Sequence, residues 1–101
     1  SLHDALPIYA DDKMVSKAVV GAIGDCYWDM DDAKKATTYY EKAIAGENAV
    51  IAPIFGKRLA TAYLSLGEKE KAVEVLENLV KTYPGASNVQ ELKKLLQIAK
   101  N

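Results

Sequence analysis

The sequence has very little cysteine and histidine, almost no net charge and no long apolar run. Its 101 residues include one cysteine and one histidine, His3. A single cysteine excludes an internal disulfide, and one histidine leaves little material for proton transfer. The formal net charge is −1, so no basic field exists to gather nucleic acid or an anionic membrane. No apolar run approaches the roughly 18 residues of a membrane-spanning helix. We therefore expect no nucleic-acid partner, and membrane contact only through a missing N-terminal anchor.

Residue sets typical of catalysis are missing as well. The sequence has no glycine loop for a phosphate, no Ser/His/Asp set and no metal-ligand spacing. An acidic cluster occurs between Asp25 and Asp32, but a calcium loop starting at Asp29 would lack its central glycine and would place Tyr40 at its twelfth position. Cys26 lies on an apolar stripe with no basic neighbour, which predicts a buried structural thiol. We expect no enzyme, no metal and no cofactor.

A pattern of small, aromatic and apolar residues occurs twice, 36 residues apart. The first copy is Gly24, Tyr27, Ala36, Tyr40 and Ala43, and the second is Ala60, Tyr63, Ala72, Leu76 and Leu79. A repeat period in the thirties is typical of stacked helical hairpins. The small residues would let paired helices approach closely, and the large residues would fill the space beside them.

Apolar residues recur every three or four positions throughout the chain, which predicts helices and no strand. We expect five, over about 15–30, 32–45, 51–66, 68–83 and 87–100. Asp11 or Asp12 would cap the first and Asp31 or Asp32 the second. Gly46 and Asn48 would stop the second helix in the left-handed conformation. The short connections make neighbouring helices antiparallel.

The second copy closely resembles the tetratricopeptide repeat. It reads Leu59-Ala60-x-x-Tyr63-x-x-Leu66-Gly67, continues with Ala72, Leu76 and Leu79, and closes at Pro84. The first copy resembles it too, but has Asp31 where the family often has glycine and Asn48 where proline is usual. The resemblance implies an all-α right-handed superhelix of stacked antiparallel hairpins.

Within residues 9–101 we place one repeat at about 17–50 and a second at about 53–86. Ser87 and Gln90 have the spacing of a capping box, which would open a C-terminal capping helix at about 87–100. Residues 1–8 resemble the translation of a sequencing adapter, so we expect them to be non-native and the chain to be truncated upstream. The runs 24–27 and 52–55 resemble the C-terminal part of bacterial envelope tetratricopeptide proteins, so cytoplasm and periplasm both stay open as the compartment.

The resemblance implies a role as a protein interaction scaffold that binds a peptide or partner protein in a concave groove. Carried over by position, the groove residues are Gly21, Asp25, Trp28, Asp29, Ile54, Lys57, Thr61 and Leu64. Trp28 lies just off the core stripe, so we expect it to be partly exposed. It would serve either as a binding anchor, the role in which tryptophan is enriched, or as a packing contact for a neighbouring helix. Gly21 and Asp25 stand where a carboxylate clamp would need lysine and asparagine, which argues against that clamp.

Two alternatives differ in kind from the scaffold. The chain could self-associate through exposed repeat ends as a homo-oligomer, because uncapped repeat faces tend to associate. It could also act as a chaperone-like factor of the bacterial envelope, which the resemblance alone suggests.

Overall fold

The computed structural model describes residues 13–101, which form five helices joined by short turns. They are α2 (Lys13–Asp29), α3 (Ala33–Ile44), α4 (Ile51–Ser65), α5 (Lys69–Thr82) and α6 (Val89–Lys100). The adapter-like residues 1–8 and the expected caps Asp11 and Asp12 lie outside the described residues. Residues 13–101 contain no strand, as the apolar spacing predicts.

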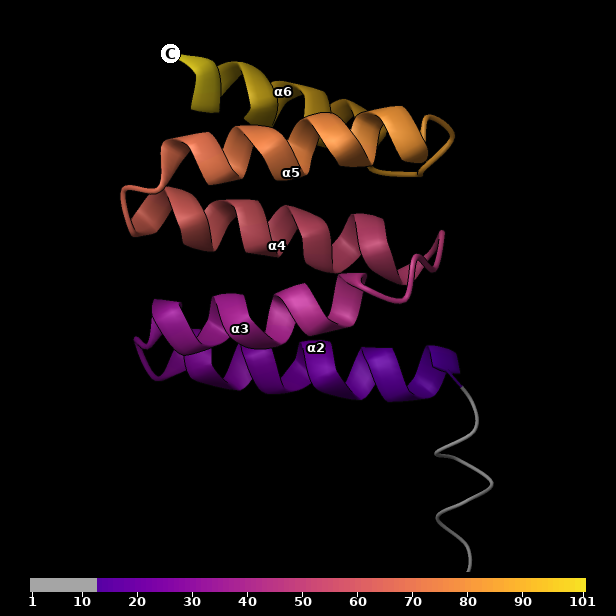
Figure 1. Cartoon of the computed structure of the whole chain (residues 1–101), viewed down its shortest axis with the longest axis vertical. Helices are drawn as coiled ribbons and strands as arrows, with labels where there is room; N and C mark the ends of the chain where they lie inside the picture. The colour runs from indigo at the N-terminus through magenta and orange to yellow at the C-terminus, as the bar shows by residue number, and fades with distance from the viewer. Residues whose placement is uncertain (1–12) are drawn as a thin grey trace, which may run out of the picture.

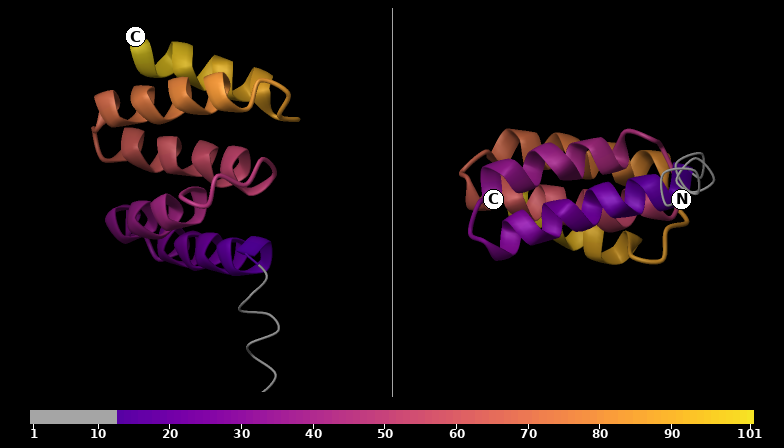
Figure 2. Two further views of the ribbon diagram at one scale, coloured as in Figure 1. Left: turned by 45° about the vertical axis from the view of Figure 1, so that its right-hand side comes forward. Right: turned by 90° about the horizontal axis from the view of Figure 1, so that it is seen from below.

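The helices stack in chain order, and each runs antiparallel to the one before it (Figure 1). Consecutive helices pack directly on each other. In addition, α4 contacts both α2 and α6. These three therefore run in the same direction and share one side of the stack. Figure 2 shows that the successive layers are turned relative to one another.

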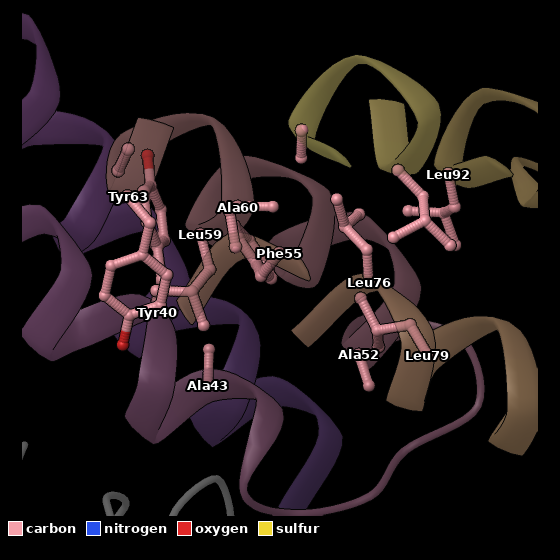
Figure 3. Close-up of a cluster of buried hydrophobic side chains, with 14 of the residues drawn as sticks. Tyr40, Ala43, Ala52, Phe55, Leu59, Ala60, Tyr63, Leu76, Leu79 and Leu92 are labelled. Carbon is pink, nitrogen blue, oxygen red and sulfur yellow. The ribbon is translucent and has the colours of Figure 1, made fainter. Parts of the chain in front are cut away.

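Small residues at the predicted positions allow the close helix packing. Ala36, Ala60 and Ala72 are fully buried. A Cβ at Gly24 would lie 2.6 Å from the Tyr40 ring, so only glycine leaves room for that ring. Figure 3 shows part of the continuous core, in which Leu59 extends toward Ala43 and the ring of Tyr40. The repeated pattern is thus a packing pattern.

The second helix begins as predicted but ends differently. Asp32 caps it, since its Oδ1 accepts the backbone N–H of Lys35 at 3.1 Å. The prediction that Gly46 and Asn48 stop the helix in the left-handed conformation is wrong. The left-handed residue there is Glu47, with φ at 53°.

Asn48 was predicted to end α3, but its side chain binds the start of the next helix. Its Oδ1 accepts the N–H groups of Val50 at 2.8 Å and Ile51 at 2.9 Å. Those donors lie at the start of α4, where backbone N–H groups lack helical partners. Asn48 therefore helps to begin α4.

The capping box predicted at Ser87 and Gln90 is not formed. Asn88 precedes α6 as its N-cap residue, and no side chain caps that helix. The Asn88 Nδ2 group instead donates to the carbonyl of Pro53 at 2.9 Å. This bond ties the start of α6 to the first turn of α4.

The prediction of a buried thiol at Cys26 is also wrong, because Cys26 is exposed. It shares its side of α2 with Val19, Ile23 and Met30, which are 54%, 38% and 64% exposed. Among residues 13–101, α2 is covered by α3 and α4 alone, and both lie on its other sides. The apolar stripe that the sequence shows on α2 therefore includes residues that neither α3 nor α4 covers.

The two helix-connecting turns after α2 and α4 use the same backbone conformation. Asp31 has φ at 63° and Gly67 has φ at 75°, and the two positions are 36 residues apart. Left-handed backbone costs an ordinary L-residue about 1–2 kcal/mol, less for aspartate, and costs glycine nothing. Asp31 thus does the work of the family's usual glycine under backbone strain.

Replacing Asp31 with glycine should raise the free energy of unfolding by about 0.5–1 kcal/mol, because it relieves this strain. Urea denaturation followed by circular dichroism measures the change. Gly67→Ala is the matched control, because it introduces at the equivalent turn the backbone strain that Asp31→Gly removes. A Cβ at Gly67 would meet nothing within 4 Å, so its expected loss of about 1 kcal/mol is purely conformational. Unchanged or lower stability in Asp31→Gly would show that the aspartate side chain outweighs the strain.

Candidate functional site

A cleft of about 460 Å³ lies along the side of the stack shared by α2, α4 and α6. The lining combines two apolar side chains with both signs of charge. It consists of Asp25, Trp28, Tyr40, Ile54, Lys57, Arg58, Thr61, Asn88 and Glu91. We call this surface the groove.

The middle of the groove is supplied by α4. Ile54, Lys57, Arg58 and Thr61 follow the i, i+3, i+4, i+7 spacing that puts residues on one helix face. The face opposite packs inward, where Leu59 is fully buried. One helix thus fixes four lining side chains on a rigid element.

Asp25 is held from two directions at the centre of the groove. The Tyr40 hydroxyl donates to its Oδ1 at 2.6 Å, and Arg58 Nη1 donates to its Oδ2 at 2.7 Å. Arg58 also lies over the Phe55 ring, 5.0 Å from its centroid. Burial, followed by the hydrogen bond to Asp25, raises the pKa of Tyr40 far above its ordinary value. Tyr40 therefore stays a neutral donor, and the carboxylate is fixed in place.

A second ion pair links α4 to α6. Lys57 Nζ lies 3.1 Å from Glu91 Oε1. The side chains of both pairs are between 38% and 60% exposed, and exposed pairs of this kind contribute at most about 1 kcal/mol. Their main effect is to align the three groove helices and to leave each groove cation beside a carboxylate.

Two large apolar side chains face the groove from either side of the charged centre. Trp28 is 39% exposed and Ile54 is 41% exposed. The Asp25–Arg58 contact sets the register, so that Trp28 lies about one turn beyond it and Ile54 about one turn before it. Along the helix axes this offset is about 10 Å, and the separation between α2 and α4 adds to it. Partial exposure of Trp28 is confirmed.

The structure brings together five of the eight groove residues expected from the sequence: Asp25, Trp28, Ile54, Lys57 and Thr61. Gly21 does not face the groove, since a Cβ there would lie 2.4 Å from Phe55 Cζ. Leu64 is half-buried and packs against the core. Asp29 is exposed but lies outside the lining.

Sequence reasoning missed four lining residues: Tyr40, Arg58, Asn88 and Glu91. Asn88 and Glu91 belong to the segment interpreted from the sequence as a C-terminal capping helix. One signal was available, because Lys57 and Glu91 are one 34-residue family period apart. That spacing predicts that α6 packs beside α4 in the same way that α4 packs beside α2.

Other kinds of site are not evident in the part of the chain that the structure describes. Residues 13–101 contain no group of three His, Cys, Asp or Glu side chains arranged to hold a metal ion. None of the five described helices is both long and apolar enough to cross a bilayer.

Comparison with known proteins supports the resemblance in the sequence. The family model described as tetratricopeptide repeat matches residues 27–96. No curated protein and no solved structure matches the chain significantly. The matched region includes the first copy of the pattern from Tyr27 onward, the whole second copy, the turn at Asp31 and most of α6, and the described helices stack as the pattern predicts. The chain therefore belongs to the tetratricopeptide repeat family.

Proposed function

We propose that the groove binds a peptide or a segment of a partner protein, and that the chain serves as a scaffold rather than an enzyme. Tetratricopeptide repeats are generally protein–protein interaction modules. The finer assignment to the groove rests on the arrangement of its side chains. A cleft of about 460 Å³ is large enough to take several side chains of a bound segment.

The observation that carries the proposal is the pairing of exposed apolar anchors with a fixed polar centre. Trp28 and Ile54 offer apolar surface on opposite sides of the two ion pairs. Tryptophan beside arginine is the composition in which binding energy concentrates at interfaces. A partner segment would bury both anchors without disturbing the core.

Trp28→Ala should weaken binding by about 2 kcal/mol or more, close to a 30-fold rise in Kd. The probe is a fluorescein-labelled 12-residue peptide selected from a random displayed library on the wild-type chain. Its Kd would be measured by fluorescence polarisation. Because Trp28 is not part of the buried core, helix content by circular dichroism should stay unchanged.

Met30→Ala is the matched control, since Met30 is an exposed apolar residue at the same end of α2 and does not line the groove. It should leave the Kd unchanged. Equal losses in both variants, or binding that tolerates Trp28→Ala, would show that the groove is not the binding surface. Unfolding of Trp28→Ala would show that Trp28 is a packing residue.

Self-association stays the alternative from the sequence. The observation that favours it is the exposed apolar side of α2 formed by Val19, Ile23, Cys26 and Met30. This surface is separate from the groove, so the two roles are compatible. The chaperone-like role in a bacterial envelope stays a prediction from resemblance.

A further inference from the structure

The two copies of the repeat differ in what covers their first helix. In the second copy that helix is α4, which contacts the preceding helix α3 as well as α5, α2 and α6. In the first copy it is α2, which lies at the end of the stack and contacts only α3 and α4 within residues 13–101 (Figure 1). The side of α2 that corresponds to the α3-covered side of α4 therefore carries no helix in the described part of the chain.

Equivalent side chains show this difference in their exposure. Three apolar residues on α2 are exposed, while the apolar residues 36 positions later on α4 are buried. The pairs are Val19 with Phe55, Ile23 with Leu59, and Cys26 with Ala62. Phe55 is 7% exposed, for example, whereas Val19 is 54% exposed. We call the side of α2 that carries Val19, Ile23 and Cys26 the outer face.

The second copy also shows what kind of helix covers these positions. The Tyr40 ring of α3 stacks on the Phe55 ring, with 6.1 Å between centroids. Leu59 extends toward Ala43 of α3 (Figure 3). The cover is thus a helix with an aromatic residue and, three positions later, a small one.

A hydrogen bond shows the same difference between the copies. The Tyr63 hydroxyl of α4 donates to the Glu41 carboxylate of α3. The equivalent residue on α2 is Tyr27, and Lys35 lies over its ring at 5.4 Å from the centroid. Lys71, 36 positions after Lys35, lies over the Tyr63 ring at 5.7 Å, so the two rings are placed alike. Within residues 13–101, however, the Tyr27 hydroxyl makes no hydrogen bond.

The other end of the stack is finished differently. The exposed residues of α6 are polar or charged except for Ile98, and they are Gln90, Glu91, Lys93, Lys94, Gln97, Ile98 and Lys100. A polar outer surface is what the end of a repeat array needs in order to contact water. Because α2 has an apolar outer face instead, its end of the stack has the character of an interface.

A second folded copy of this chain does not supply the matching cover. Its α3 is enclosed by α2 and α4, and its α5 by α4 and α6. Pairing two outer faces would place α2 on α2, and that face has neither an aromatic ring nor a carboxylate among Val19, Ile23 and Cys26. The observations therefore favour a helix from a different protein.

We infer that the outer face of α2 binds an amphipathic α-helix of a partner protein. The contact side of that helix carries an aromatic residue, a carboxylate directly after it, and a small residue three positions after the aromatic one. The ring packs on Val19, the small residue leaves room for Ile23, and the carboxylate accepts from the Tyr27 hydroxyl. This face is separate from the groove, so the inference goes beyond the proposed function and does not depend on it.

The test uses a probe helix of this kind taken from the chain itself. It is the acetylated and amidated peptide 32–45, in which Thr38→Glu is joined to Lys42 by a side-chain lactam. Both positions are exposed on α3, and the bridge stabilises a segment that would be marginal as a free helix. Cys26 is the chain's one cysteine, so its rate of alkylation by N-ethylmaleimide reports whether the outer face is covered.

We expect the peptide to slow the alkylation of Cys26 by about tenfold or more, with saturation below about 1 mM peptide. The same peptide with Ala43→Glu should give no protection, because it places a charge where the small residue must pack. The dependence of the rate on peptide concentration gives the Kd.

Ile23→Glu in the full chain should weaken binding of the peptide by about tenfold or more, since the charge would be buried under the bound helix. Ile98→Glu is the matched control, because Ile98 is an exposed apolar residue on α6, and it should leave the Kd unchanged. Circular dichroism shows whether each variant folds. If Ile23→Glu unfolds, Val19→Glu tests the same face at a more exposed position.

The carboxylate is tested by a double-mutant cycle. Glu41→Ala in the peptide should weaken its binding to the wild-type chain by about threefold or more, through loss of the hydrogen bond. With the Tyr27→Phe chain the two peptides should bind equally, because the donor is gone. A loss of the same size on both chains would show that the carboxylate does not meet Tyr27.

Unchanged reactivity of Cys26 at about 1 mM peptide overturns the inference, and so does equal protection by the Ala43→Glu peptide. Protection that rises with the concentration of the chain alone, together with a dimer in sedimentation that Ile23→Glu disrupts, would identify a second copy as the occupant and overturn it too. The groove is judged separately, since the Kd of the library-selected peptide should not depend on whether the probe helix is bound.

Discussion

Replacing Tyr40 with alanine is expected to lower the free energy of unfolding by about 3–5 kcal/mol, the range seen when a buried aromatic is truncated. Tyr40 is 2% exposed and belongs to the central core. Its ring packs 6.1 Å from the Phe55 ring and fills the space that Gly24 leaves open. The alanine variant therefore creates a cavity where α2, α3 and α4 meet. Urea denaturation followed by circular dichroism measures the loss.

Tyr40→Phe separates the ring from the hydroxyl. It keeps the packing and removes only the hydrogen bond to Asp25, so a loss of about 0.5–1.5 kcal/mol is expected. If the phenylalanine variant were as unstable as the alanine variant, the polar contact rather than the ring would hold this region.

The difference in unfolding free energy between wild type and Tyr40→Phe should change with pH in one direction. Burial first, and then Asp25, raise the pKa of Tyr40 above its ordinary value of 10.0. The folded state thus holds this proton more tightly than the unfolded chain does. The stability linked to it is complete below pH 10 and is lost as the pH rises above that value. The difference between wild type and Tyr40→Phe should therefore be constant from neutral pH to about pH 10 and shrink beyond it.

Leu59→Ala should lower the free energy of unfolding by about 2–5 kcal/mol. The loss depends on how far the surrounding side chains collapse into the cavity. Leu59 is fully buried on α4, the helix that contacts α3 and α5 on either side. A cavity here weakens the interface between the two repeats, and neighbour interfaces carry much of the stability of such arrays. Thermal denaturation of both proteins gives the change.

Leu66→Ala is the matched control, because Leu66 ends the same helix and is 39% exposed. It should lose about 1 kcal/mol or less. Similar losses in the two variants would contradict the view that α4 is anchored by its inward face.

The helices and their order could be predicted from the sequence, because they depend on local spacing. The pairs Gly24 with Ala60 and Ala36 with Ala72 predicted where helices approach closely, and those positions are buried or tightly packed. Predictions that relied on a single turn fared worse. Glu47 takes the left-handed conformation that was assigned to Gly46 and Asn48, since propensity alone does not say where tertiary packing lets a helix end.

The groove was predictable only in part. Family positions identified Trp28, Ile54 and Lys57 as lining residues. They also placed Gly21 in the groove, although the Phe55 ring covers it. Cys26 shows the opposite error, because an apolar stripe does not reveal which of its residues a neighbouring helix covers.

The sequence by itself determined the all-α repeat architecture, because a periodic apolar pattern and short connections act within and between adjacent helices. Only the tertiary structure decided which charges meet. The pairing of Asp25 with Arg58 and of Lys57 with Glu91 joins residues more than 30 positions apart, and depends on the register between helices that are not neighbours in the chain. That register follows from how the buried side chains of α3 and α5 space α2, α4 and α6. Spacing along the chain therefore encodes the scaffold, while the binding surface arises from the stacking.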